Sequence, residues 1–375
     1  MTSSPKASYL DYAATAPVKP QVITVIADAL ACHGNASSVH GFGRSAREKV
    51  EHARHAIAKR YHVKPGQVVF TSGATEANNT VLNAYRNRPM IISGIEHASV
   101  RQTAQALGTP HVIAVDGNGL ININHLEELL KANPQSVVSI MLVNNETGVM
   151  QPVREAAALA KKYGAVVHCD ATQGAGRMVV DFKGLGVDMM SLSAHKLGGP
   201  QGVGALIIAD GHKLSPLIFG GSQESRMRAG TENVAGIAGF GRAVELIDED
   251  LAKTELWASW RDAFEARLKA AVQEVTVFGA NAARVAAISL VAMPGVRNDT
   301  QLMAFDLAGF AVSSGSACSS GKVTVSPVLQ AMGMGDELTL SSIRVSFGWG
   351  TSAGELENLA QSWIQLYQRS GKKFV

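Results

Sequence analysis

The sequence contains few cysteines and few aromatic residues, and it has no long apolar run. Its 3 cysteines, among 375 residues, are Cys32, Cys169 and Cys318. An odd number of cysteines without metal-ligand spacing predicts neither a disulfide framework nor a metal site, and such thiols are typical of a reducing compartment. No apolar run approaches the ~20 residues of a membrane-spanning helix, and the first residues lack the apolar core of a signal peptide. We therefore expect a cytoplasmic protein without a membrane partner.

Charge is also scarce along the chain. Charged residues make up 17% of the sequence, and the formal net charge is only +3. No basic run carries interleaved aromatic side chains, so the charge pattern does not support a nucleic-acid partner. Hydrophobic residues, at 46%, are abundant enough for a large core. A chain of this length usually divides into two domains.

Seven short apolar runs alternate with helix-like stretches between about residues 20 and 209. Apolar strands joined by crossover helices are typical of a parallel sheet that is covered on both faces. The sequence thus predicts an α/β fold, with a mostly parallel seven-stranded sheet and helices on both of its faces. In such sheets, ligands bind beyond the carboxyl ends of the strands. The expected strands are 68–71, 90–93, 112–115, 137–143, 165–169, 188–192 and 203–208.

The pattern changes after about residue 230. A long helical region, 234–274, precedes strands near 285–291 and 343–347 and helices near 300–307 and 353–366. We interpret this part as a smaller α+β domain. The large domain would comprise residues 17–245, and the small domain residues 1–16 and 246–375, including the segment around Cys318.

Two charged residues lie just after predicted strands. Lys196 comes after the strand 188–192, and partial burial would lower the pKa of such an amine and let it form a Schiff base with an aldehyde. Asp170 follows the strand 165–169, where a carboxylate could pair with the protonated ring nitrogen of a pyridoxal cofactor. Taken singly, Lys196 also fits a surface turn and Asp170 a helix N-cap.

Two further motifs lie at strand ends. Residues 71–76 place small side chains at the start of a helix, where free N–H groups and the helix dipole favour a phosphate, although an ordinary capping box also fits. His97 follows the strand 90–93, and a lone histidine there also fits a structural role. Pyridoxal phosphate explains the phosphate cradle, the ring acid and the lysine together. A dinucleotide site is less well supported, because the Gly-x-Gly-x-x-Ala match at 41–46 does not follow a strand.

With these motifs, the chain resembles the cysteine desulfurases of the NifS/IscS kind, in the class-V aminotransferase group of fold-type-I pyridoxal-phosphate enzymes. The likeness covers nearly the whole chain. Ala36, Gln201 and Trp349 depart from the residues usual in that family. The resemblance rests on the segments 9–17, 34–40, 71–76, 96–97, 144–148, 170–173, 193–196, 220–224, 228–231, 313–319 and 341–344.

The resemblance implies a role for each cofactor-binding residue. Lys196 would carry pyridoxal 5′-phosphate as a Schiff base, and Asp170 would face its ring nitrogen. His97 would stack on the ring and move protons, while Gln173 would contact the ring hydroxyl and Asn145 would lie beside the cofactor. The phosphate would be held by Ala74, Thr75, Ser193 and His195, and by Thr231 of a neighbouring subunit, so a homodimer is expected.

The substrate side of the site involves Asn145, Arg344 and Cys318. The resemblance assigns the substrate carboxylate to Asn145 and Arg344, and a guanidinium does bind a carboxylate with two parallel hydrogen bonds. Cys318 lies among serines and glycines rather than among the apolar neighbours of an inert cysteine. We predict that the enzyme converts L-cysteine to L-alanine, with the sulfur held as a persulfide on Cys318 for an acceptor protein such as an iron–sulfur scaffold. No intrinsic metal is expected, although Cys318 could share an iron–sulfur cluster with the scaffold.

Three alternatives stay open at this point. A selenocysteine lyase of the same family would be distinguished by testing both amino acids as substrates. A class-V aminotransferase would need no thiol and would require a keto-acid acceptor. A catalytically silent interaction protein would keep the fold but would not show the absorbance of the bound cofactor.

Overall fold

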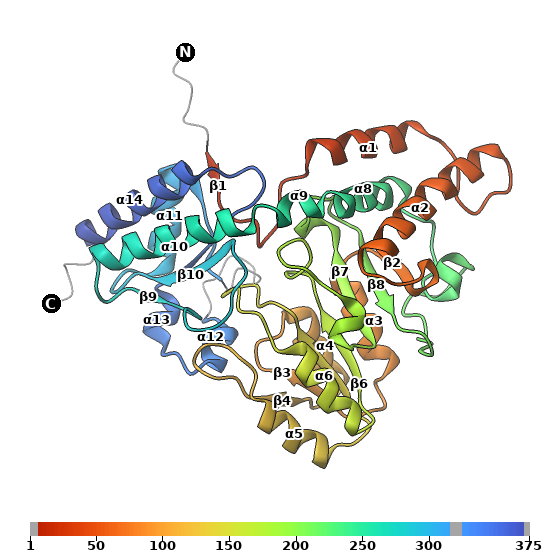
Figure 1. The fold of residues 1–375 in the computed structure, drawn as a ribbon, viewed down its shortest axis with the longest axis horizontal. Helices are drawn as coiled ribbons and strands as arrows, with labels where there is room; N and C mark the ends of the chain where they lie inside the picture. The colour runs from red at the N-terminus through yellow and green to blue at the C-terminus, as the bar shows by residue number, and fades with distance from the viewer. Residues whose placement is uncertain (1–6, 316–324, 371–375) are drawn as a thin grey trace.

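The computed structural model describes residues 7–315 and 325–370, which form two domains packed side by side (Figure 1). In the large domain, seven strands form one sheet in the order β2-β8-β7-β6-β5-β3-β4. These strands are β2 (Val68–Thr71), β3 (Met90–Ser93), β4 (His111–Ile113), β5 (Val137–Met141), β6 (Val166–Asp170), β7 (Met189–Ser193) and β8 (Gly204–Ile208).

The sheet is mostly parallel. Strands β7, β6, β5, β3 and β4 run in one direction, whereas β8 lies antiparallel between β7 and β2. Each strand begins and ends within two residues of its expected bounds, so the prediction of a mostly parallel seven-stranded sheet is confirmed. The runs were recognisable because every residue of β2, β3, β5, β6, β7 and β8 is buried.

Helices cover both faces of this sheet, as predicted. Successive residues of a strand point to opposite faces, so Val137 and Val166 pack on the side of α3 and α4. Val138 and Val167 pack on the other side, in a core shared with α2, α5, α6 and α8. The helices of this domain are α1 (Pro20–Ala31), α2 (Gly41–Arg60), α3 (Ala74–Ala84), α4 (Ala98–Leu107), α5 (Ile123–Ala132), α6 (Val153–Lys162), α7 (Phe182–Leu185) and α8 (Val234–Glu245), with single turns η1 (Pro65–Gln67), η2 (Ala194–Lys196) and η3 (Gln223–Arg226).

The C-terminal domain is smaller and has its own core around the fully buried Trp363. Its antiparallel sheet has the order β12-β10-β9, and a separate parallel pair joins β1 to β11. The expected helical region 234–274 consists of α8 and two further helices of this domain. The elements are β1 (Ser8–Tyr9), β9 (Thr276–Val277), β10 (Ile288–Ala292), β11 (Phe310–Ala311), β12 (Ser342–Ser346), α9 (Ile247–Leu251), α10 (Thr254–Ala271), α11 (Asn298–Leu307), α12 (Pro327–Ala331), α13 (Asp336–Leu340) and α14 (Ala353–Ser370).

An N-terminal arm, residues 10–19 between β1 and α1, connects the two domains. Leu10 belongs to the small-domain core and Ala13 to the large-domain core. Between them, Asp11 forms a bridge with Ser346 of β12, and the N–H of Ala13 donates to the hydroxyl of Ser346 at 2.9 Å. The expected grouping of 1–16 with 246–375 stays a prediction in its exact boundaries. In the part of the chain that is described, no helix has the length and apolar character needed to cross a membrane.

Candidate active site

A cavity of about 610 Å³ lies at the carboxyl ends of the parallel strands. Its lining comes from both domains and from the N-terminal arm. Ten of the predicted site residues line it: Ala74, Thr75, His97, Asn145, Asp170, Gln173, Ser193, His195, Lys196 and Arg344. These residues are separated by up to 270 positions in the sequence (344 − 74 = 270), and the fold brings them to one place.

Two predicted residues are not among the residues that line the cavity. Cys318 lies outside the described residues, and Gly315, three positions before it, is the nearest described residue on that side and does line the cavity. Thr231 is exposed on the large domain and does not line this cavity. Its expected role concerns the site of a second subunit, and that role stays a prediction.

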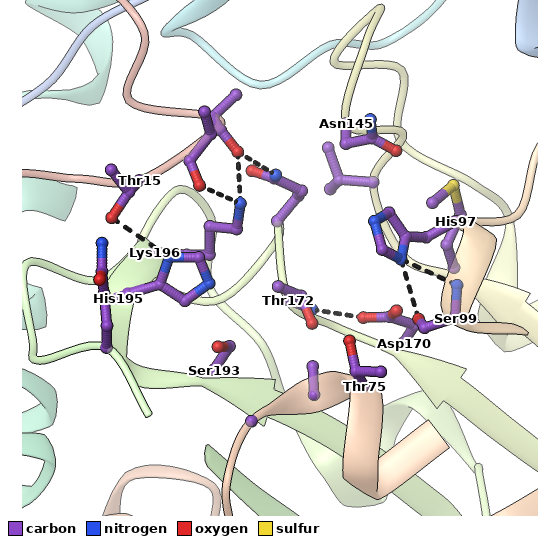
Figure 2. Close-up of a pocket in the computed structure, with 18 of the residues that line it drawn as sticks. Thr15, Thr75, His97, Ser99, Asn145, Asp170, Thr172, Ser193, His195 and Lys196 are labelled. Carbon is purple, nitrogen blue, oxygen red and sulfur yellow. Dashed lines mark hydrogen bonds between the residues drawn. The ribbon is translucent and has the colours of Figure 1, made fainter. Parts of the chain in front are cut away.

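Lys196 ends the turn η2, which follows β7 directly. Its Nζ donates hydrogen bonds of 2.6 Å to the carbonyl oxygens of Ala13 and Ala14 in the N-terminal arm (Figure 2). The arm thereby holds the amine at the side of the cavity on which the two domains meet. A partly buried amine at this position agrees with the sequence-based expectation.

Asp170, the last residue of β6, is almost fully buried at the cavity floor. Its two carboxylate oxygens accept from the Nδ2 of Asn78 at 2.8 Å and from the backbone N–H of Thr172 at 3.0 Å. Asn78 also donates to the hydroxyl of Ser99 at 2.8 Å. Asn78, on the buried face of α3, therefore connects the carboxylate of Asp170 to the turn that carries His97.

His97 is the N-cap of α4, and its Nδ1 accepts from the backbone N–H of Ser99 at 3.1 Å. The hydroxyl of Ser99 lies 2.8 Å from the same nitrogen. Burial lowers the pKa of His97, the charge of Asp170 opposes this shift, and Lys196 and Arg101 add to it. A neutral ring that accepts at Nδ1 carries its proton on Nε2, and Figure 2 shows the opposite side of the ring facing the centre of the cavity.

The start of α3 forms the predicted anion cradle. Gly73 is the N-cap, and among the described residues no side chain caps this helix start. Gly204 lets β8 approach closely, because a Cβ there would lie 2.7 Å from the Cα of Gly73. The alternative capping box with Ser72 or Thr71 as the cap is wrong, because the cap is Gly73 and neither side chain accepts a hydrogen bond from the helix start; Glu76 accepts from the backbone N–H of Ser72 and pairs with Arg228. The uncapped start leaves the positive end of the helix dipole facing the cavity.

Ser193 and His195 line the same cavity, and Ser193 lies beside this helix start, because it pairs with Gly204, which packs against Gly73 (Figure 2). The Nδ1 of His195 lies 3.2 Å from the hydroxyl of Thr15. Burial lowers the pKa of His195 to about 4, with further contributions from Lys196 and Arg177. His195 is therefore a neutral hydrogen-bonding group near pH 7, and not a fixed positive charge.

Arg344, in β12, contributes the guanidinium from the small domain. Its Nη2 donates to Asp11 at 2.7 Å and its Nη1 to the backbone carbonyl of Asn145 at 2.9 Å. Its Nε is buried and has no hydrogen-bond partner among the described residues. The predicted pair of Asn145 and Arg344 is thus in direct contact. Each Nη nitrogen carries a second N–H, so the guanidinium retains donors for a ligand.

Comparison with known families gives the context for this geometry. The model of the aminotransferase class-V family matches residues 8–359, which is most of the chain. The chain belongs to the class-V aminotransferase family. Two of its relatives are the cysteine desulfurase IscS of Dictyoglomus turgidum, 39% identical over 93% of this chain and 91% of that protein, and the putative cysteine desulfurase IscS 1 of Bacillus subtilis, 38% identical over 96% and 98%.

Solved structures agree with this class-V assignment. A NifS-like protein from Rickettsia africae superposes with a TM-score of 0.89, at 34% identity over 96% of this chain and 99% of that chain. The protein SspA, solved in complex with cysteine, superposes with a TM-score of 0.78, at 29% identity over 91% and 98%. The predicted fold, two domains of the NifS-like pyridoxal-phosphate type, is therefore confirmed.

Class-V aminotransferases use pyridoxal phosphate, and the residues of this cavity fit that group. The uncapped start of α3 suits the phosphate, and Asp170 supplies a buried carboxylate for a protonated ring nitrogen. Two buried oxygens at the cavity, Gln173 Oε1 and Thr172 Oγ1, have no hydrogen-bond partner among the described residues. Such polar atoms cost free energy unless a ligand or water satisfies them.

Several residues of this site are not predicted by the sequence. The arm residues Ala13, Ala14 and Thr15 contribute backbone carbonyls and one hydroxyl, which carry no signal in a residue pattern. Asn78 lies within an amphipathic helix and belongs to no motif. Its polar side chain on the otherwise apolar buried face could have indicated a site residue. Ser99, two positions after His97, could have been found as the partner of the histidine N-cap.

Proposed function

We propose that this protein is a cysteine desulfurase, which converts L-cysteine to L-alanine and holds the sulfur as a persulfide on Cys318. The observation that carries the proposal is the joint presence of Lys196, Asp170, His97 and Arg344 around one cavity whose lining includes Gly315, three positions before Cys318. Relatives named cysteine desulfurase, 34–39% identical over most of the chain, support it.

Pyridoxal phosphate would supply an electron sink for the carbon atoms of the substrate. Lys196 would anchor it covalently, and Asp170 would keep a proton on its ring nitrogen. Asn78 and the N–H of Thr172 hold that carboxylate from two sides, so its direction is fixed before any ligand enters. The start of α3, Ser193 and His195 would bind the phosphate group.

Arg344 would bind the carboxylate of L-cysteine. Asp11 and the carbonyl of Asn145 orient the guanidinium, and the second N–H of each Nη nitrogen can donate to the ligand. Proton transfers fall to two groups. Lys196 Nζ can take the α-proton of the substrate, and the Nε2–H of His97 can donate to a developing negative charge.

The sulfur step requires a thiol at the substrate. The thiolate of Cys318 forms an S–S bond with the substrate sulfur while the Cβ–S bond breaks. The electron pair of that bond, together with a proton, is retained by the alanine product. Cysteine and the protein thiol therefore become alanine and a protein persulfide, without an external oxidant or reductant.

The test compares alanine and sulfide formation by the wild-type protein and the Cys318→Ala variant, with L-cysteine and a thiol reductant. Equal amounts of both products are expected from the wild type. The variant should form neither, yet it should keep the absorbance of the bound cofactor. Cys32→Ala is the matched control, because Cys32 is exposed and does not line the cavity, and it should behave as the wild type. Full turnover by Cys318→Ala would refute the proposal.

We infer further that the enzyme works as a homodimer in the cytoplasm and passes its sulfur to an acceptor protein such as an iron–sulfur scaffold. Thr231 lies on the surface of the large domain, where a second subunit could use it for its own phosphate site. Sedimentation of the holoenzyme tests whether it is a dimer. A monomer that binds the cofactor as tightly as the dimer does would contradict the inference.

A further inference from the structure

Glu146 is a buried acid that the proposed reaction does not use. It is 4% exposed and follows β5 in the loop that also carries Asn145. The side chain of the fully buried Asn144 fixes this loop, because its Oδ1 accepts from the backbone N–H groups of Glu146 and Thr147, both at 2.9 Å. The backbone that carries Glu146 is therefore held in one conformation.

One carboxylate oxygen of Glu146, Oε2, contacts residues on both flanks of the segment 316–324. The hydroxyl of Ser326 donates to Oε2 of Glu146 at 2.6 Å. A Cβ added to Gly315 would lie 2.7 Å from that oxygen, so the backbone of Gly315 packs against it. Gly315 and Ser326 are eleven positions apart (326 − 315 = 11), yet a single atom lies against both.

Ser326 is anchored on its other side as well. Its hydroxyl oxygen accepts from the backbone N–H of Leu329 at 3.1 Å, which makes Ser326 the N-cap of α12. One hydroxyl thus donates to Glu146 and caps a helix, and both bonds require a single orientation of the Ser326 side chain. Ser326, two positions after the segment 316–324, is therefore fixed relative to Glu146.

We propose that Glu146 is a positioning residue that holds together the two ends of the segment bearing Cys318. This inference rests on the proposed function, since it gives Cys318 the role of sulfur acceptor. Three residues of chain span at most about 11 Å, so the place of Gly315 limits where the thiol of Cys318 can reach. Closing a loop costs entropy, and the contacts of Glu146 with Gly315 and Ser326 offset this cost in the native state.

The charges around Glu146 oppose the effect of its burial. Burial raises the pKa of Glu146, whereas the hydrogen bond from Ser326 and the positive charges of Arg344 and Arg101 lower it. Arg344 also contacts the carbonyl of Asn145, the residue before Glu146. The loop therefore joins the proposed substrate-binding guanidinium to the base of the thiol-bearing segment.

The test uses Glu146→Ala, Glu146→Gln and Ser326→Ala in the full-length holoenzyme. The matched control is Ser289→Ala, which removes an equally buried serine hydroxyl that donates to another buried acid, Glu265, at 2.7 Å. Neither Ser289 nor Glu265 lines the cavity. Two readouts are combined: tryptic cleavage after Lys322, followed by mass spectrometry, and kcat and KM for L-cysteine.

We expect Glu146→Ala and Ser326→Ala to speed cleavage after Lys322 about tenfold, because a buried hydrogen bond at the base of the segment is lost. Their kcat should fall by between about tenfold and about a hundredfold, as expected for a misplaced reactive group. KM and the cofactor absorbance should stay near the wild-type values. Glu146→Gln keeps an acceptor oxygen for Ser326, so its cleavage rate after Lys322 and its kcat should both stay close to the wild-type values.

Unchanged cleavage and kcat in Glu146→Ala would overturn the inference. The inference would also be overturned if Glu146→Ala lowered stability, raised KM and reduced the cofactor absorbance together, and Ser289→Ala did the same. That result would indicate a structural role only. Failure of the proposed function is distinguishable from both outcomes. It would appear as full turnover by Cys318→Ala, whereas the cleavage readout does not depend on turnover.

Discussion

Glu96, the residue before His97, is a second buried acid beside the cavity. Its Oε1 accepts from the backbone N–H of Met141 at 2.7 Å and from the hydroxyl of Ser93, whereas its Oε2 has no partner among the described residues. Burial raises the pKa of Glu96 to about 8, against these hydrogen bonds, and the charge of Asp170 adds to the rise. Glu96 thus joins the turn of His97 to the end of β5 while remaining protonated at neutral pH.

This raised pKa predicts a pH dependence of stability. In the unfolded chain Glu96 would lose its proton near pH 4.5, but in the folded protein only near pH 8. The folded state therefore binds more protons between these values, and its free energy of unfolding falls as pH rises from about 4.5 to about 8. Glu96→Gln cannot ionise, so its stability relative to the wild type should improve by a few kcal/mol across this range. Denaturant unfolding of both proteins at pH 5 and pH 8 measures the difference, and an equal difference at both pH values would contradict it.

At the scale of elements, the strands were predictable and the cavity wall was only partly so. Strands buried on both faces give continuous apolar runs, and the residues that follow them, such as Asp170 and Lys196, were predicted because they are polar and come next in sequence. Contacts made by backbone carbonyls of the arm carry no residue signature. The partnership of Glu146 with Ser326 could not be read either, because it joins positions 180 residues apart.

The meeting of β8 with the start of α3 gives a prediction for Gly204. A Cβ at Gly204 would lie 2.6 Å from the carbonyl oxygen of Leu192 and 2.7 Å from the Cα of Gly73. Gly204→Ala should therefore displace the phosphate-binding start of α3, at a cost of about 1–3 kcal/mol for overpacking. We expect cofactor affinity to fall by between about fivefold and about a hundredfold, measured by absorbance titration of the cofactor-free protein.

The control for this variant is Gly66→Ala. Apart from its chain neighbours, no described residue has an atom within 4 Å of the position that its Cβ would occupy. Its cofactor affinity should equal that of the wild type. If Gly204→Ala also bound the cofactor as tightly as the wild type, the close approach of β8 to Gly73 would have no part in holding the phosphate.

At the scale of the whole molecule, the N-terminal arm is the element that both domains and the site share. It is anchored in the small-domain core by Leu10 and in the large-domain core by Ala13. Between and beside these anchors it contacts Lys196, His195 and Arg344 through backbone carbonyls, Thr15 and Asp11. The arm continues from the end of β1 and crosses to α1 along the junction of the domains (Figure 1). A substitution in the arm should therefore change the position of side chains in the site without altering the packing of either core.

Asp11 offers the sharpest test of this coupling. It pairs with Arg344 at 2.7 Å across the domain junction. Asp11→Asn should leave the guanidinium less firmly oriented, so KM for L-cysteine should rise about tenfold while kcat changes less, because a hydrogen bond between charged groups is weakened. Asp262→Asn is the control, because it breaks a pair of similar length with Arg261 that does not line the cavity. A lower KM in Asp11→Asn would contradict this expectation. It would mean that Asp11 competes with the substrate carboxylate for Arg344, so that the arm weakens the binding of L-cysteine.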